Sequence, residues 1–265
     1  MTEPIHIISL GAGVQSSTVA LMAASGEIVP MPHSAVFAHV GDENEPDSVY
    51  RQLDWLEKNL PFPIVRVSVG NLVEQIRGAN VNGNRCSNPP FFVWVDGEET
   101  MIRRKCTHDF KIVPLRRYAR KLNKETDRPI VKWIGISLDE VYRMKESDVG
   151  YITHRHPLIE LKMSRHDCVR WLEKRGFPKA PKSACWFCPY SSDTRWAEMK
   201  REDPKSWDRA VKLDKDIRNC LPNVLRGEAF IHRSCKPLSE VDFSTEEERG
   251  QLNMFNNDCS GTCGV

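Results

Sequence analysis

The sequence lacks the long apolar runs that membrane-spanning helices require. None of its 265 residues lies in a stretch approaching the roughly 18 consecutive apolar residues of a spanning helix. A basic stretch followed by an apolar run is also missing near residue 1, so we expect a cytoplasmic protein without a membrane partner. An excess of one charge is absent too, because 38 Lys and Arg residues face 36 Asp and Glu residues. The net charge of +2 by itself predicts no polyanionic partner.

Internal repeats and low-complexity tracts are absent as well. The hydrophobic fraction of 40% and the charged fraction of 28% match ordinary soluble proteins, which excludes collagen-like and mostly disordered chains. Cysteine is the abundant exception, with nine residues. Disulfide frameworks are rare in a reducing compartment, and an odd number of thiols cannot pair fully within one chain. Metal binding or sulfur chemistry is therefore the leading explanation for some of these cysteines.

The first half of the chain alternates short apolar runs with helical spacing. Buried strands are predicted at residues 5–10, 35–40, 64–69 and 132–137. Helical spacing follows them at residues 17–25, 49–59, from residue 71, and around residues 115–122. Strands that alternate with helices predict an α/β fold in which a parallel, twisted sheet carries helices on both faces.

The second half has a different texture, in which strand patterns fade and short helices dominate. Helices are predicted at residues 164–175, where Ser164 and Asp167 form a capping box, and at 193–201 and 204–219. An irregular insertion at residues 78–104 contains Asp96-Gly97, which is typical of a hairpin turn. We therefore expect an α/β domain over residues 1–150 and a smaller helical, cysteine-containing region over residues 151–265.

A turn rich in glycine and serine connects the first strand to the first helix. Small residues let the backbone approach an anion, and helix-start N–H groups with serine hydroxyls then hold phosphate. The turn lacks the Gly-Lys pair of the phosphate loop and the third glycine of the dinucleotide fingerprint. Taken alone, it fits a phosphate site and a plain strand-to-helix turn equally. Its residues are Leu10, Gly11, Ala12, Gly13, Val14, Gln15, Ser16 and Ser17.

This turn resembles the pyrophosphatase loop (PP-loop) of the adenine nucleotide alpha-hydrolase-like superfamily. The usual form of that loop is Ser-Gly-Gly-x-Asp-Ser-Ser or Thr, and Gly13, Ser16 and Ser17 match it. Gln15 stands in place of the Asp, as in many sulfonucleotide reductases, which points to the phosphoadenosine-phosphosulfate (PAPS) reductase-like branch. Four later segments resemble motifs of that branch in the same order: residues 37–50 with Asp42, Glu45 and Tyr50; residues 106–115 with Lys111; residues 135–143; and residues 183–190 with a Cys-x-x-Cys pair.

The resemblance implies a nucleotide-binding α/β fold and an enzyme that binds an adenine nucleotide. The nucleotide is either ATP with Mg²⁺ or a sulfonucleotide, PAPS or adenylyl sulfate (APS). Contacts to it are implied for the PP-loop and for Asp42, Gly135 and Ile136. Lys111 and Arg143 are the candidate catalytic residues, because cations stabilise negative charge that develops on phosphate.

The cysteines form the second candidate site. Cys185 and Cys188 have a spacing that binds one metal centre, and the resemblance adds Cys106. We favour an iron–sulfur cluster, of the 4Fe-4S type, with Cys259 as a further ligand; zinc and inert or redox-active thiols are the alternatives. Cys263, in a C-terminal Cys-Gly similar to that of sulfonucleotide reductases, suits sulfur relay. Other candidates for the remaining ligand are Cys263 itself, Cys235 and Cys168, or an iron left open for sulfide.

Residues 103–124 carry nine Lys or Arg residues and one acid, Asp109. Most charge runs are solvated helix faces, but this one also fits a nucleic-acid surface. The resemblance therefore implies an ATP pyrophosphatase that adenylates a substrate for sulfur transfer, similar to the iron–sulfur proteins of DNA phosphorothioation. Its partners would be a nucleic acid and a sulfur donor such as a cysteine desulfurase. Two alternatives stay open: a PAPS or APS reductase, and a non-catalytic nucleotide-binding partner in a sulfur-transfer or defence complex.

Overall fold

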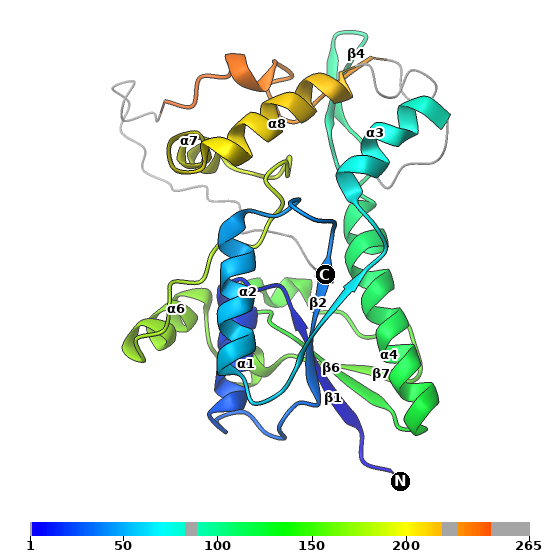
Figure 1. Ribbon diagram of the computed structural model, residues 1–265, viewed down its shortest axis with the longest axis vertical. Helices are drawn as coiled ribbons and strands as arrows, with labels where there is room; N and C mark the ends of the chain where they lie inside the picture. The colour runs from blue at the N-terminus through cyan, green and yellow to red at the C-terminus, as the bar shows by residue number, and fades with distance from the viewer. Residues whose placement is uncertain (1, 83–88, 219–226, 245–265) are drawn as a thin grey trace.

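A five-stranded parallel sheet forms the core of the lower half of the molecule as drawn in Figure 1. The computed structural model describes residues 2–82, 89–218 and 227–244. The strands lie in the order β3-β2-β1-β6-β7, and every neighbouring pair runs parallel. Their bounds are β1 Ile5–Leu10, β2 Ser34–His39, β3 Ile64–Ser68, β6 Ile130–Ile134 and β7 Ile152–Arg155.

Helices cover both faces of this sheet. One face packs against α1 (Val14–Ala24), α2 (Asp47–Asn59) and α6 (Arg165–Lys174). The other face packs against α4 (Val113–Thr126), which contributes Leu115 and Ala119 to its core. Strand β1 explains how one sheet serves two cores. Its residues Ile8 and Leu10 face α1, whereas Ile5 and Ile7 face α4, as the two-residue period of a strand requires.

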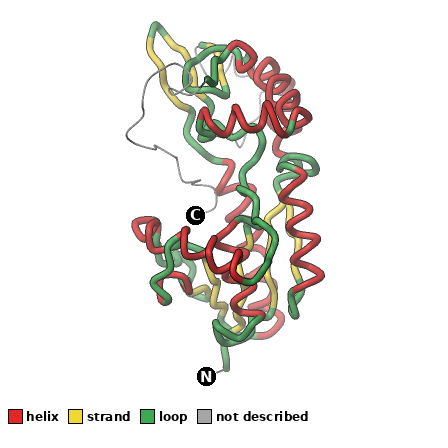
Figure 2. The backbone as a smooth tube through the Cα atoms, turned by 90° about the vertical axis from the view of Figure 1, so that its left-hand side faces the viewer, coloured by secondary structure: helices red, strands yellow, loops and turns green. Residues whose placement is uncertain are grey.

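The arrangement confirms the expected α/β fold class with a helical region that follows it. Beyond the carboxyl ends of the strands lies a second layer with its own hydrophobic core (Figure 2). It contains α3 (Leu72–Asn82), α7 (Asp193–Glu202), α8 (Pro204–Ile217) and a small antiparallel sheet in the order β5-β4-β8. The strands of that sheet are β4 Phe92–Val95, β5 Glu98–Met101 and β8 Glu228–Phe230.

The predicted hairpin is present between β4 and β5. Asp96 and Gly97 both have positive φ values, 49° and 88°, which suit a tight two-residue turn between antiparallel strands. The capping box is also present, since Ser164 accepts a hydrogen bond from the Asp167 backbone and the Asp167 carboxylate accepts one from the Ser164 backbone. Local sequence signals at these two places are therefore sufficient to specify the local structure.

Two features differ from the expected division at residue 150. Strand β7 lies after that position but completes the main sheet, and the insertion at 78–104 joins residues 228–230 in the small sheet. Polar residues explain why β7 was not expected, because Thr153, His154 and Arg155 interrupt any apolar pattern. His154 lies in this strand.

Shorter connecting turns are α5 (Pro157–Glu160), a π-helical turn η1 (His108–Ile112) and 3₁₀ turns η2 (Leu138–Arg143) and η3 (Leu238–Glu240). In the part of the chain described, no helix has the length and apolar character needed to cross a membrane.

Candidate functional site

A cavity of about 130 Å³ opens where the strand order of the main sheet reverses, between β1 and β6. After β1 the chain crosses to β2 on one side of it, whereas β6 lies on the other side. The loops that follow β1 and β6 therefore diverge at the carboxyl ends of these two strands. Open α/β sheets bind ligands in this crevice. The lining comes from the end of β1 with the loop after it, from residues 134–136 after β6, and from residues 181–184.

The glycine- and serine-rich loop closes one wall of this first cavity. The Gly11 backbone N–H donates to Ser16 Oγ at 3.1 Å, and that hydroxyl donates to the Gly13 carbonyl at 3.3 Å. Ala12 has a φ of 56°, in the left-handed region that favours glycine. Helix α1 begins at Val14 with neither a side-chain cap nor an acidic residue in its first turn. Its first N–H groups and the positive end of its dipole therefore suit an anion.

Two glycines let separate segments approach this loop closely. A Cβ on Gly135 would lie 3.0 Å from the Ser16 backbone nitrogen, so the end of β6 packs directly against the start of α1. A Cβ on Gly13 would lie 2.8 Å from Ser183 Oγ. Residues 181–184 therefore rest on the loop, and they lead directly into Cys185.

Cationic side chains surround the first cavity. They are Lys111, Arg143, Arg165 and Lys182. Among the described residues that line this cavity, Glu140 is the one carboxylate. Four cations against one carboxylate favour an anionic ligand such as a polyphosphate.

Gln15 connects the polar groups of this cavity. Its Nε2 donates to Glu140 Oε2 at 3.2 Å, and its Oε1 accepts from Arg165 Nη1 at 2.9 Å. Arg143 Nη1 donates to the other oxygen of Glu140 at 2.6 Å. An Asp at position 15 would set a carboxylate against buried Glu140, whereas an amide donates to it. The amide at position 15 therefore has a local electrostatic reason.

A second, smaller cavity of about 30 Å³ is lined by three cysteines, Cys106, Cys185 and Cys188. Cys185 and Cys188 belong to one turn, in which the Cys188 N–H donates to the Cys185 carbonyl at 3.1 Å. Lys111 lines this second cavity as well as the first. It lies in the π-helical turn before α4, and such turns are frequent at functional sites. The two cavities are therefore neighbours.

The acidic loop after β2, residues 42–47, contacts the segments that lie between the two cavities. Buried Glu45 pairs with Lys111 at 3.6 Å, and the Glu43 carbonyl accepts from Trp186 Nε1 at 2.6 Å. Burial raises the pKa of Tyr50 to about 12, with the negative charge of Glu45 as the next contribution. Tyr50 therefore stays a neutral phenol, which donates to the Gly41 carbonyl at 3.3 Å. These contacts tie the acidic loop to the Lys111 turn and to the cysteine turn.

The second cavity offers three thiols as candidate ligands for a metal centre. In the described parts of the chain, no three His, Cys, Asp or Glu side chains come close enough together to hold one metal ion. Zinc requires four donors around one point, whereas a cluster spreads its thiolates over several irons. Three thiols around one cavity therefore meet the chemistry of a cluster, with one ligand to be added.

Most residues predicted to contact a nucleotide line the first cavity. They are Leu10, Gly11, Gly13, Val14, Gln15, Ser16, Gly135 and Ile136, together with Lys111 and Arg143. Ala12 and Ser17 are fully buried beneath the loop. Asp42 is not part of the lining, because its side chain is 96% exposed and lies 3.5 Å from His39 Nε2. Cys259 and Cys263 lie outside the described residues.

Arg165, Lys182 and Ser183 are among the lining residues that sequence reasoning did not assign to the site. Arg165 is the first residue of α6, so the capping box located it without indicating which way it points. Lys182 and Ser183 directly precede Cys185, but their role depends on residues 181–184 folding back over Gly13. Only tertiary structure gives that contact.

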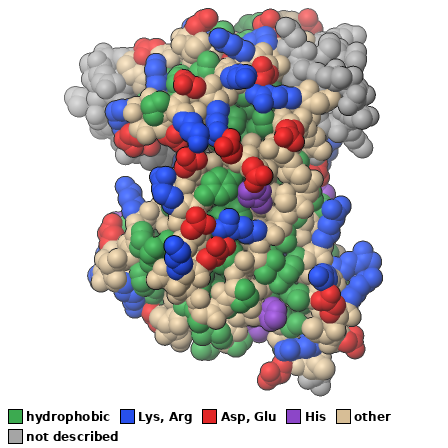
Figure 3. All heavy atoms as spheres, in the orientation of Figure 1, with side chains coloured by type: hydrophobic (Ala, Val, Ile, Leu, Met, Phe, Trp, Pro, Cys, Tyr) green, Lys and Arg blue, Asp and Glu red, His purple; other side chains and the backbone are tan. Residues whose placement is uncertain are grey.

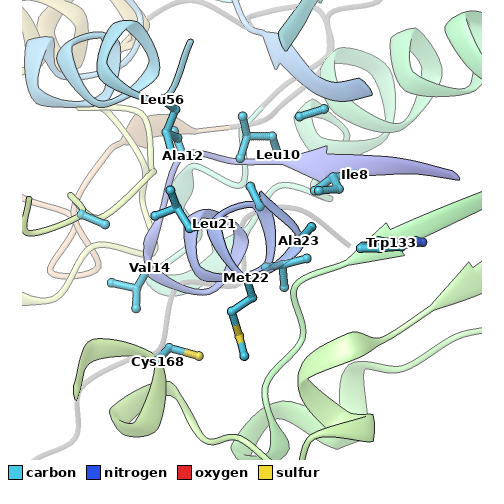
Figure 4. Close-up of a cluster of buried hydrophobic side chains, with 14 of the residues drawn as sticks. Ile8, Leu10, Ala12, Val14, Leu21, Met22, Ala23, Leu56, Trp133 and Cys168 are labelled. Carbon is cyan, nitrogen blue, oxygen red and sulfur yellow. The ribbon is translucent and has the colours of Figure 1, made fainter. Parts of the chain in front are cut away.

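Cys168 and Cys235 lie apart from the cysteine-lined cavity. Cys168 is fully buried between α6 and α1, beside Val14 and Met22 (Figure 4). Burial raises the pKa of its thiol to about 12, which makes it inert as a thiolate. Burial also raises the pKa of the Cys235 thiol. Among the described cysteines, the candidate ligands are therefore the three around the second cavity.

Several cations of the basic segment at 103–124 already have partners within the molecule. Lys111 faces the cavities, Arg116 pairs with Asp148, and Lys121 lies 3.8 Å from Glu125. On the face shown in Figure 3, Lys and Arg side chains alternate with Asp and Glu over both layers. That face therefore presents a mixed surface and no broad field of one sign.

The fold and cavities define an α/β protein with a doubly wound parallel sheet and a crevice lined by cations at its switch point. No protein-family model matches the chain, and no curated protein matches it significantly. PAPS reductase from Candida auris, in a phosphate complex, is structurally similar at 12% identity and a TM-score of 0.46, covering 70% of this chain and 83% of that one. The U34-tRNA thiolase NcsA from Methanococcus maripaludis, with its 4Fe-4S cluster, is similar at 14% identity and a TM-score of 0.39, covering 81% of this chain and 72% of that one.

Proposed function

We propose that the chain is an ATP pyrophosphatase that activates a substrate oxygen for sulfur transfer. One observation carries this proposal. A cavity suited to polyphosphate adjoins a cavity lined by three thiols, and Lys111 lines both. A plain nucleotide-binding protein has no need for the thiols, and a plain metal site has no need for the cationic loop.

The first cavity offers what ATP requires. The start of α1 and the four cations around it would hold the phosphates. Phe37 and Ala38, at the end of β2, and Ile136 supply apolar surface for the base. Mg²⁺ would gain little from the protein, because Glu140 already accepts hydrogen bonds from Gln15 and Arg143. The ion would therefore be held mainly by phosphate oxygens and water.

Adenylation is the reaction that these residues would promote. A substrate oxygen attacks the α-phosphorus of ATP, a new O–P bond forms, and the bond to the β-phosphate oxygen breaks as pyrophosphate leaves with the electron pair. Lys111 and Arg143 would stabilise the charge that develops on the phosphates. A sulfur nucleophile then displaces AMP from the activated carbon or phosphorus. This order of steps requires the sulfur donor to reach the activated atom, and the thiol-lined cavity lies beside the nucleotide cavity.

Cys106, Cys185 and Cys188 would hold the iron–sulfur cluster, with Cys259 proposed as the fourth ligand. Thiolates are the usual ligands of such clusters. An iron open to sulfide would be available only in the alternative in which no fourth cysteine ligates the cluster. The role of the protein here is to fix the three thiols in one cavity and to keep them beside Lys111.

A nucleic acid is the proposed acceptor of sulfur, as in DNA phosphorothioation, and a cysteine desulfurase is the proposed donor. Support for the acceptor comes from the basic segment. Arg117 and Arg120 of α4 stand near Arg116 on the sequence and have no ion pair among the described residues. They are the residues whose charge is available for phosphates of a larger substrate.

Pyrophosphate release from ATP is the decisive assay for this function. The anaerobically purified protein is supplied with sulfide and single-stranded DNA, and Lys111→Met is compared with Lys124→Met, an exposed residue of α4, the helix that follows the Lys111 turn. We expect Lys111→Met to lose at least tenfold in rate, which corresponds to about 1.4 kcal/mol, and Lys124→Met to match the wild type. Sulfite release from PAPS would instead assign a reductase. ATP binding without turnover would leave a nucleotide-binding partner.

Iron and acid-labile sulfide analysis tests the second cavity independently. We expect the wild type to contain both and Cys185→Ala to lose them, because Cys185 lines the cavity. Cys168→Ala is the matched control, since that thiol is buried elsewhere. A colourless wild type that holds zinc would contradict the cluster.

A further inference from the structure

Arg195 is a buried cation next to the cysteine turn. It lies in the first turn of α7, and its side chain is 9% exposed. Its Nη2 donates to the carbonyl of Ala184 at 3.0 Å. Ala184 is bonded to Cys185, so the guanidinium lies one peptide unit from a proposed cluster ligand. It also holds the entry to the cysteine turn in place.

The charge of Arg195 has no counter-charge in the described structure. Its Nη1 is buried and makes no hydrogen bond, and no carboxylate among the described residues forms an ion pair with it. Asp193, on the same turn of α7, pairs instead with His232 at 3.0 Å and with Arg233 at 2.8 Å. Buried guanidinium groups are normally paired, because an isolated charge loses its hydration without compensation.

Two neighbouring donors share this lack of partners. Ser191 Oγ and Trp196 Nε1 are buried and make no hydrogen bond among the described residues. Ser191 is continuous with the cysteine turn, because its N–H donates to the Cys188 carbonyl at 3.0 Å. Unsatisfied buried donors are few in native proteins, and three within residues 191–196 indicate that an acceptor or an anion is missing from this region.

We propose that Arg195 is the fixed counter-charge for an anionic metal–thiolate group held on Cys185 and Cys188. This inference rests on the proposed function, which places a cluster on those thiols. Each thiolate ligand adds a negative charge, so a loaded site would be anionic, and a nearby buried cation would stabilise it. Arg195 acts through the cluster and the turn, as a positioning residue, and touches no nucleotide.

The proposal predicts opposite effects on the empty and loaded protein. Without metal, the buried charge is a cost, so Arg195→Met, which keeps the length and removes the charge, should leave the melting temperature unchanged or raise it. With metal, the same variant should lose the stabilisation that loading gives the wild type. A merely structural arginine would predict the same loss of stability in both states.

The reduction potential gives a second and independent readout. A cation near a cluster favours the reduced, more negative state, because net charge is one determinant of the potential. Arg195→Met should therefore lower the potential, by at least a tenfold change in the reduction equilibrium, or 59 mV for one electron. Arg195→Lys keeps the charge and should restore most of it. Arg201→Gln, an exposed residue on the same helix that pairs with Glu202, is the control.

The experiment reconstitutes all four proteins anaerobically with ferrous iron and sulfide. Iron per chain, the melting temperature before and after loading, and the potential by absorbance titration are then measured. Arg195→Gln serves as a second neutral variant should Arg195→Met not fold. Loading with an unchanged potential in the neutral variant that folds would overturn the role of Arg195 and leave the cluster intact. A wild type that takes up no iron would overturn the cluster and this role together.

Discussion

Gly135 is the position where a single methyl group would disturb the candidate nucleotide site most directly. A Cβ there would lie 3.0 Å from the Ser16 nitrogen and 3.2 Å from the Gln15 carbonyl carbon. These are backbone atoms of the helix start and cannot rotate away. We expect Gly135→Ala to lower the free energy of unfolding by about 1–3 kcal/mol, as overpacking does, and to weaken ATP binding.

Urea unfolding and calorimetric titration with ATP measure both effects of Gly135→Ala. Gly150→Ala is the matched control, because a Cβ at Gly150 would meet nothing within 4 Å. Equal ATP affinity in Gly135→Ala and the wild type would separate the loop at residues 10–17 from nucleotide binding.

Lys132 on β6 gives a pH-dependent contribution to stability. Burial, and then the positive charge of Arg116, lower its pKa from the ordinary value of 10.5 to about 8. Between these two values the unfolded chain binds the proton and the folded chain does not, so this residue makes stability rise with pH from about 8 to 10.5. Below pH 8 the buried charge costs stability in full.

Lys132→Met should remove this dependence. We expect the variant to be more stable than the wild type at pH 7, by about 1–3 kcal/mol, and the difference to shrink as the pH rises toward 10. Urea unfolding of both proteins at several pH values measures the difference. A constant difference between pH 7 and 10 would contradict the lowered pKa of Lys132.

At the residue scale, the sequence indicated the glycine–serine loop and the cysteine pair because both are contiguous patterns. Arg165 and Arg195 could not be found in this way, since the first depends on where α6 packs and the second on the absence of a partner acid. Asp42 shows the opposite case. It belongs to a recognisable motif, but its side chain points to solvent, whereas Glu45 of the same loop is buried against Lys111.

Helix α6 is the element whose start places Arg165 at the first cavity. Ser164 Oγ accepts from the Asp167 N–H at 3.1 Å, and the Asp167 carboxylate accepts from both the hydroxyl and the backbone N–H of Ser164. These hydrogen bonds, with a further one from Arg170, hold the pKa of Asp167 well below its usual range. The cap therefore contributes above the unfolded pKa of about 4 and weakens as the pH falls below it.

Ser164→Ala should cost about 1 kcal/mol of stability, as the loss of a helix cap does, and should also weaken ATP binding because Arg165 loses its fixed position. Asp203→Ala is the control, since Asp203 caps α8 by accepting from the Ser206 N–H at 3.1 Å, away from the first cavity. Both variants should lose comparable stability in urea, and only Ser164→Ala should lose ATP affinity. Unchanged ATP affinity in Ser164→Ala would show that Arg165 does not contact the nucleotide.

At the element scale, periodicity predicted the long helices and the inner strands, but not the edges. Strands β1 and β2 are apolar on both faces, so their sequence alone marks them as buried. Strand β7 lies at the edge with a polar sequence, and β8 has three residues that pair with β4 from the far end of the chain. Both β7 and β8 form because they pair with a strand distant in the sequence, and no local sequence pattern encodes such pairing.

The whole molecule is built from two layers with separate cores and adjoining cavities. The first cavity is lined by residues of the main sheet, α1 and the segments near them, and no cysteine is among its described lining. The second cavity is lined by residues near Cys106 and by the cysteine turn. Because different elements build them, nucleotide binding and cluster loading should be separable by mutation even though Lys111 contributes to both.

Cys185→Ala and Ser16→Ala test this separation in opposite directions. Cys185→Ala should lose iron but keep ATP binding, so ATP at 100 times its Kd should still stabilise it by about 2.7 kcal/mol. Ser16→Ala removes the hydroxyl that links Gly11 to Gly13, so it should keep iron and lose much of the ATP-dependent stabilisation. Iron analysis and thermal unfolding with and without ATP measure both. Both variants should fail in sulfur transfer, because the reaction needs the two cavities in one molecule. Loss of ATP binding in Cys185→Ala would instead mean that the layers fold and bind as one cooperative unit.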